Sequence, residues 1–259
     1  MRFSLRCMDG AWMKTVILYE DQDILVCEKP AGLAVQSARA SEMDMESELR
    51  NYLHGCGVYV VHRLDQPVEG LLVFAKSSAM AAKLGAQMKN GTMKKYYRAL
   101  VCGRMQQTEG EWVDEIVKKG NGVGEIVTGS AENGKQTASD VHAGICEEPK
   151  KQRRRGGDAN AEAKRAVLSY QVESYDADTD VSNVKICLQT GRFHQIRLQF
   201  SHAGHPLVGD RKYGDENAKR LAEVLGLKSV ALCAERLCFR HPRTGKQLDF
   251  SVTPGFHKK

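Results

Sequence analysis

The chain has 259 residues, of which 42% are hydrophobic and 27% are charged, a composition typical of a globular protein that buries a core of its own. It contains no run of about 18 apolar residues and no charged leader before an apolar segment, so we expect neither a membrane span nor a secretory signal, with a cytoplasmic location as the default. Seven basic and two acidic residues between positions 150 and 165 supply +5 of the net charge of +6, so overall basicity is no argument for a nucleic-acid partner.

Strands are the more frequent predicted element along the chain. Alternating apolar and polar residues, or short β-branched runs, predict strands at 15–19, 23–28, 58–61, 71–75, 94–102, 166–172, 181–188, 230–239 and 247–252. Apolar residues at helical spacing predict helices at 41–54, with Ser41 as a possible cap, at 77–90 and at 193–202. These elements favour an α+β fold, a mixed, largely antiparallel sheet with flanking helices and loops.

We interpret residues 1–259 as a single domain, interrupted by a basic insert at about 147–163. The insert is rich in Lys, Arg, Gly and Asp and nearly lacks apolar residues, so we expect a solvated loop or disordered segment, with a phosphate-contacting arm as the alternative. The eight cysteines are scattered without a CxxC pair, and the histidines supply no matching ligand pairs. Reduced, mostly core thiols and no metal site are therefore expected.

Three separated segments concentrate reactive side chains beside glycines and strand ends, where a rigid sheet can hold exposed groups. They read VHRLDQPVEGLLVFAK at 61–76, KYYRALVCG at 95–103, and LQTGRFHQIR at 188–197 followed by GHPLVGDRKYG at 204–214. Taken singly they are weak signals. Asp65 could be a turn or cap residue, Tyr97 a core aromatic and Arg197 a solvated charge.

In this order and spacing the segments resemble the RluA-type family of pseudouridine synthases, and the resemblance extends over roughly residues 15–255. It implies the pseudouridine synthase catalytic fold and an RNA substrate, either rRNA or tRNA. It also implies Asp65 as the catalytic carboxylate, Tyr97 as the active-site tyrosine and Arg197 as the partner of that carboxylate. Arg63 is expected to fill the space of the extruded uridine, and the remaining candidate RNA-binding residues are His62, Arg192, His194 and Gln195.

The chemistry of this family explains these residue types. Pseudouridine formation breaks the bond between ribose and uracil N1, turns the base and joins the ribose to C5, so no cofactor is expected. An ionised carboxylate can attack the sugar, attack the base or assist loss of a sugar proton, and the sequence leaves these routes open. An arginine keeps that carboxylate charged in a desolvated pocket, and a tyrosine can stack on uracil and take part in proton transfer. The target base must be flipped into the pocket.

The sequence departs from the family at a few positions. Val68-Glu69 replaces the usual pair of small hydroxyl residues, and Leu198-Gln199-Phe200 replaces valine-histidine-leucine. We expect the Glu69 carboxylate to point to solvent or to meet a lysine. The first hairpin begins by about residue 15, so no N-terminal RNA-binding module of the S4 type is expected.

Two other functions compete with an active synthase. A catalytically inactive RNA-binding or ribosome-assembly factor of the same fold is conceivable because of Val68-Glu69, although such a factor has no need of Asp65. An unrelated carboxylate hydrolase is weaker, because no second acidic residue stands out as an acid/base partner. A monomer is the default expectation for the oligomeric state.

Overall fold

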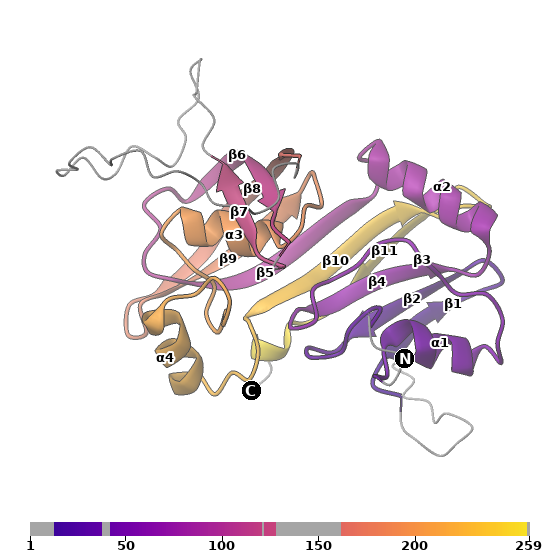
Figure 1. Cartoon of the computed structure of the whole chain (residues 1–259), viewed down its shortest axis with the longest axis horizontal. Helices are drawn as coiled ribbons and strands as arrows, with labels where there is room; N and C mark the ends of the chain where they lie inside the picture. Colours follow the sequence, from indigo (N-terminus) through magenta and orange to yellow (C-terminus); the bar gives the residue numbers. More distant parts are fainter. Residues whose placement is uncertain (1–12, 38–41, 121, 128–161, 258–259) are drawn as a thin grey trace.

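The computed structural model describes residues 13–37, 42–120, 122–127 and 162–257, and this part of the chain forms one mixed sheet of eleven strands with four α-helices (Figure 1). The predicted α+β fold with a mostly antiparallel sheet is confirmed. The strands are β1 Val16–Glu20, β2 Ile24–Lys29, β3 Tyr59–Val60, β4 Glu69–Ala75, β5 Lys94–Cys102, β6 Glu109–Lys118, β7 Gly124–Val127, β8 Lys164–Asp176, β9 Val181–Leu188, β10 Leu232–Arg240 and β11 Gln247–Ser251. The helices are α1 Met45–Tyr52, α2 Ser78–Lys89, α3 Gln195–His202 and α4 Glu216–Val224, with a short 3-10 turn at Gly255–His257.

The predicted strands and helices are all present, with ends shifted by a few residues. The helix expected at 41–54 begins at Met45, because the Asp44 carboxylate accepts the Ser47 backbone N–H and caps it there. The proposed cap Ser41 lies outside the described residues. Helix α2 is capped by the Ser77 side chain and ends at Lys89, with Asn90 as its C-cap, close to the predicted range 77–90.

Three elements were not predicted from the sequence. Strands β6 and β7 expose one face for most of their length, and β6 extends the sheet from β8 by eight paired residues. Helix α4 is amphipathic and capped by Asp215, which accepts the Ala218 N–H. The basic insert expected at 147–163 lies, apart from its last two residues, outside the described residues.

Strand β10 joins two parts of the sheet whose strands come from distant parts of the sequence. The sheet order is β1-β2-β4-β10-β5-β9-β8-β6-β7, and the β4–β10 step is a parallel pairing of only two residue pairs, Glu69 with Cys233 and Gly70 with Ala234 (Figure 1). Gly70 has φ +122°, and a Cβ there would lie 2.5 Å from the Ala234 backbone. Only glycine therefore permits this close approach between the two strands.

The two faces of the sheet carry separate cores. One face packs Leu25, Leu72, Ala99 and Ile186 into the larger core, which also includes Tyr97. The other packs β2, β4 and β10 against α2, with Leu84 fully buried. Because strand side chains alternate between faces, alternate residues of β5 point to the larger core, and the candidate site lies on that face.

Of the six cysteines that the structure describes, Cys27, Cys102 and Cys233 are buried, Cys187 and Cys238 are partly buried and Cys56 is exposed. Cys7 and Cys146 lie outside the described residues. Within the described ranges, no helix is long and apolar enough to cross a membrane.

Candidate active site

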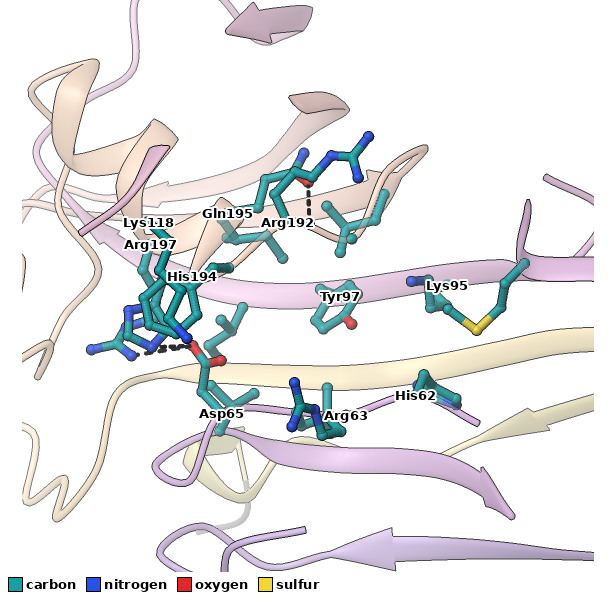
Figure 2. A pocket seen from close by; sticks show the side chains of 18 residues that line it. His62, Arg63, Asp65, Lys95, Tyr97, Lys118, Arg192, His194, Gln195 and Arg197 are labelled. Atoms are coloured by element: carbon teal, nitrogen blue, oxygen red, sulfur yellow. Dashed lines mark hydrogen bonds and ion pairs between the residues drawn. The ribbon is translucent and has the colours of Figure 1, made fainter. Parts of the chain in front are cut away.

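A cavity opens over the middle of the sheet, on the face of the larger core, and brings the three motif segments together (Figure 2). The loop between β3 and β4 supplies Asp65, strand β5 supplies Tyr97, and helix α3 supplies Arg197. Every residue singled out from the sequence lines this cavity, namely His62, Arg63, Asp65, Tyr97, Arg192, His194, Gln195 and Arg197. The lining also includes Lys95 and Lys118, which were not singled out.

A buried lysine fixes the loop that carries Asp65. The ammonium of Lys29, fully buried, donates to the backbone carbonyls of Pro30, Leu33 and Gln66, so it ties the end of β2 to the residue that follows Asp65. Burial lowers the pKa of Lys29 to about 8, while the charges of Asp65 and Glu69 act in the opposite direction. These hydrogen bonds fix the loop that carries Asp65 relative to the sheet.

Arg197 is shared between two carboxylates. Its Nε and Nη2 donate to Oδ2 and Oδ1 of Asp210, both at 2.7 Å, while its Nη1 donates to Oδ2 of Asp65 at 3.2 Å. Although burial works to lower the pKa of the guanidinium, both carboxylates raise it above its ordinary value. Arg197 is therefore a permanent cation, aligned by a bidentate pair with Asp210, and it donates an Nη1 N–H to Asp65.

Asp210 was not singled out from the sequence, although it belongs to the quoted GD segment. It is 1% exposed, and its Oδ1 also accepts the backbone N–H groups of Lys212 and Tyr213. Burial works to raise the pKa of Asp210, but Arg197 and these N–H groups hold it below its usual value. Because Asp210 accepts all of these hydrogen bonds, it stays ionised and fixed, and it holds the Arg197 side chain in one orientation.

Tyr97 lies in the cavity between Asp65 and Lys95 (Figure 2). Burial raises the pKa of its phenol well above the ordinary value, and the negative charge of Asp65 adds to this effect. The phenol is therefore protonated at neutral pH, so it can donate a hydrogen bond, and its ring offers a flat apolar surface.

His194 is held beside Asp65 in a left-handed backbone conformation, φ +51°. Its Nδ1 lies 2.6 Å from the Tyr213 hydroxyl, its ring stacks on Phe193, and its Nε2 lies 3.8 Å from Asp65 Oδ2. Burial lowers the pKa of His194 to about 4, so the ring is neutral at pH 7. It can meet RNA as a flat, uncharged surface.

Gln195 and Arg192 shape the turn before α3. The Gln195 side-chain oxygen accepts the Thr190 hydroxyl at 2.8 Å and the Arg192 N–H at 3.0 Å, so this buried amide organises the turn from within. The Arg192 guanidinium donates to the Arg165 carbonyl at 2.7 Å and is exposed. Of the two, only Arg192 presents a free surface to a polyanion.

His62 and Arg63 are neighbours with opposite exposure. His62 is 8% exposed, its Nε2 accepts the Val73 N–H at 3.3 Å, and burial lowers its pKa to about 3. Its Nδ1 has no hydrogen-bond partner in the part of the chain that the structure describes. Arg63 is exposed and lines the cavity, so its guanidinium is accessible to a ligand.

The two departures from the family pattern leave the cavity intact. Glu69 does not line the cavity, and its carboxylate accepts the Gly255 backbone N–H at 2.5 Å in an exposed hydrogen bond, so its protein partner is a main-chain amide and not a lysine. Gln199 is buried and donates to Asp114 at 2.7 Å. Neither substitution places a new charge beside Asp65.

One further cluster, Asp21, Asp23 and His241, has carboxylate and imidazole atoms close enough to hold a metal ion. Each group already has a protein partner. His241 pairs with Asp21 at 2.8 Å and Arg243 makes a two-pronged pair with Asp23. The cluster closes the loop after β10 onto the β1–β2 turn.

Comparison of the sequence and the fold with known proteins identifies the protein family to which the chain belongs. Residues 23–202 match the family model for RNA pseudouridylate synthase. The chain belongs to this family of RNA-modifying isomerases, within its RluA-type branch.

Relatives of known name lie in that branch. The chain is 33% identical over 242 residues to a tRNA pseudouridine synthase C of Pasteurella multocida, covering 91% of this chain and 90% of the relative. It is 31% identical to the dual-specificity RNA pseudouridine synthase RluA of Vibrio cholerae, covering 88% and 78%. In fold it is similar to human RNA pseudouridylate synthase domain containing 4, with a TM-score of 0.66, 24% identity, and 92% and 88% of the two chains covered.

Proposed function

We propose that this pseudouridine synthase acts on a uridine of tRNA or rRNA, with Asp65 as the catalytic carboxylate. The observation that carries the assignment is the sharing of Arg197 between Asp210 and Asp65 at the floor of a cavity that Tyr97 also lines. Relatives that act on tRNA and on the large ribosomal subunit match at similar identity, 33% and 28%, which supports both RNA classes equally.

Asp65 is suited to nucleophilic attack because one of its carboxylate oxygens accepts no hydrogen bond from the described residues. Among the described residues, its carboxylate receives a single hydrogen bond, the 3.2 Å bond from Arg197. Arg197 in turn is already neutralised by Asp210, so it orients Asp65 without tying up both oxygens. The free oxygen can form a bond to the ribose or the base, or take a proton from the sugar.

The remaining residues of the cavity each contact a different part of the flipped nucleotide or support the cavity wall. The Tyr97 ring stacks against the uracil and its protonated phenol takes part in proton transfer. Arg63 enters the gap left in the RNA, and Arg192 contacts phosphate. The neutral, flat ring of His194 packs against the nucleotide, while His62 and Gln195 act from beneath by shaping the cavity wall.

Single-domain organisation, action as a monomer and independence from any cofactor or metal belong to the same proposal. Isomerisation needs no external oxidant, reductant or energy source. The residues facing the substrate are one carboxylate, a phenol and several cations, and this set is sufficient for nucleophilic and proton-transfer steps.

The inactive RNA-binding factor is the second candidate, and one experiment separates it from the synthase. Total RNA from cells with the wild-type protein, with Asp65→Ala and without the protein is mapped for pseudouridine. We expect at least one site that is present with the wild type and absent in the other two samples. Asp65→Ala should still bind RNA, since its carboxylate only repels phosphate. Equal modification in all three samples would refute the enzymatic assignment and favour the binding factor.

A further inference from the structure

Lys95 stands on the same face of β5 as Tyr97. The two positions are separated by one residue, and alternate residues of a strand lie roughly 7 Å apart on one face, about the width of a pyrimidine ring with its carbonyl groups. Both side chains line the cavity, and Figure 2 shows Tyr97 between Asp65 on one side and Lys95 on the other. A base stacked on Tyr97 with its sugar at Asp65 therefore has its far edge toward Lys95.

The Lys95 ammonium has no acceptor among the residues that the structure describes. Within the described ranges it makes no hydrogen bond and no ion pair, unlike Lys29, which donates to three carbonyls. Burial lowers the pKa of Lys95, as expected of a cation without a counter-ion. Its positive charge also contributes to the low pKa of the neighbouring His62.

The turn before α3 leaves room for this ammonium. A Cβ at Gly191 would lie 3.3 Å from Lys95 Nζ, so the absence of a side chain there keeps the space beside the ammonium open. Two other cations of the cavity lining have contacts of their own, since Arg192 donates to the Arg165 carbonyl and Lys118 lies 4.9 Å over the Phe193 ring.

The reaction creates a negative charge where Lys95 can reach it. If the ribose–N1 bond breaks first, its electron pair leaves with the uracil, Asp65 supplies the pair for a new bond to C1′, and the ring anion is delocalised over N1, O2 and O4. If Asp65 adds to C6 instead, the C5–C6 π pair moves toward O4 as an enolate. In the first route C5 then attacks C1′ and the bond between C1′ and Asp65 breaks, which frees the carboxylate. In the second route the N1–C1′ bond breaks, C5 joins C1′, and loss of the C5 proton expels Asp65 from C6. In both routes C5 gives up one proton and N1 gains one, so the negative charge on the ring is lost.

We propose that Lys95 is a catalytic residue whose ammonium binds a uracil carbonyl oxygen and stabilises the negative charge that the ring acquires during isomerisation. This inference rests on the proposed function. Lys95 neither gains nor loses a proton in the cycle, and it acts by charge alone. A donor placed in a water-poor site before the charge develops contributes more than the same donor in water.

The test compares Lys95→Met and Lys95→Arg with Lys94→Met, a matched control that removes the same charge one residue earlier, from an exposed position on the other face of β5. Single-turnover conversion is measured at saturating RNA. We expect Lys95→Met to slow conversion by about 10²-fold with little change in RNA affinity, Lys95→Arg to recover part of the loss, and Lys94→Met to match the wild type.

A second substrate separates charge stabilisation from other roles. RNA with 5-fluorouridine at the target carries a base whose anion is intrinsically more stable, so the deficit of Lys95→Met in consuming that nucleotide should shrink. Lys95→Gln serves as the alternative neutral variant if Lys95→Met does not fold.

An unchanged saturating rate in Lys95→Met would overturn the inference, and so would a loss confined to RNA affinity, which is the behaviour of a phosphate contact. Failure of the proposed function has a different signature. In that case the wild type forms no pseudouridine, or Asp65→Ala forms as much as the wild type.

Discussion

Asp65 and Asp21 are equally exposed, with 27% of each side chain accessible, and both sit beside a cation or imidazole, yet their surroundings differ in kind. Asp21 accepts four hydrogen bonds, from the Tyr19 hydroxyl, the backbone N–H groups of Asp23 and Ile24, and His241. Partial burial works to raise the pKa of Asp21, but these donors together hold it below its ordinary value. Asp65 accepts one hydrogen bond among the described residues.

The difference separates a carboxylate that stabilises the fold from the one that we propose to react. A carboxylate that accepts a full set of hydrogen bonds has no lone pair left for a substrate, and those hydrogen bonds stabilise the folded state. A carboxylate in a cavity that accepts only one hydrogen bond is oriented by that bond and keeps an oxygen available for the substrate. A short ion pair is therefore a poor marker of a catalytic carboxylate, and unfilled acceptor capacity facing a cavity is a better one.

The largest expected effect comes from matched substitutions at the two positions. Asp65→Asn should lower pseudouridine formation by about 10⁴-fold or more, with the melting temperature nearly unchanged. Asp21→Asn should lower the unfolding free energy by about 1–2 kcal/mol while turnover stays within about twofold. Product assays and urea unfolding of both variants measure this, and comparable turnover in the two would break the distinction.

Asp210→Ala is the next in size, because it leaves the Arg197 charge buried without its two-pronged partner. We expect a loss of about 3–5 kcal/mol of unfolding free energy and a large fall in turnover, since Arg197 no longer has a fixed direction. Denaturation and single-turnover rates are the measurements. If turnover in folded Asp210→Ala equals that of the wild type, Arg197 does not need Asp210 for its orientation.

A pH effect of intermediate size follows from His62. Its folded-state pKa of about 3 lies below the value of about 6.5 in the unfolded chain, so the unfolded state binds more protons as the pH falls below 6.5 and stability decreases. Between pH 7 and pH 5 this single group costs about 2 kcal/mol. Urea unfolding at the two pH values should show a smaller difference in His62→Gln, and an equal difference would refute the assignment.

The smallest effect is expected at Glu69. Its carboxylate meets the Gly255 amide outside the cavity, so Glu69→Ser, the residue type usual in the family, should leave turnover within about threefold of the wild type. The change removes one exposed hydrogen bond and should cost less than about 1 kcal/mol. A gain in turnover of tenfold or more would show that the Glu69 charge does reach Asp65 or the RNA.

Much of the sheet and the main catalytic candidates could be predicted from the sequence. Strand β5 alternates clearly because one of its faces is buried, and the TGR and GD segments mark their turns with glycine. The pairing of Asp65 with Arg197, 132 positions apart, came only from the family resemblance, because residue spacing carries no information about contacts between distant segments.

Other features depend on packing that no local pattern reveals. A lysine is normally exposed, so nothing in the sequence indicates that Lys29 is fully buried beneath the Asp65 loop. The selection of Asp210 as the main partner of Arg197 depends on how the turn before α4 folds back onto α3. Strands β6 and β7 expose one face along most of their length, which weakens the hydrophobic signal.

The position of β10 also sets when the enzyme can become active. This strand fills the place between β4 and β5, and its partners in both strands were synthesised more than 130 positions earlier. The part of the sheet next to Asp65 and the part that carries Tyr97 therefore cannot be joined before β10 has been synthesised. The cavity that needs both parts forms only after that step.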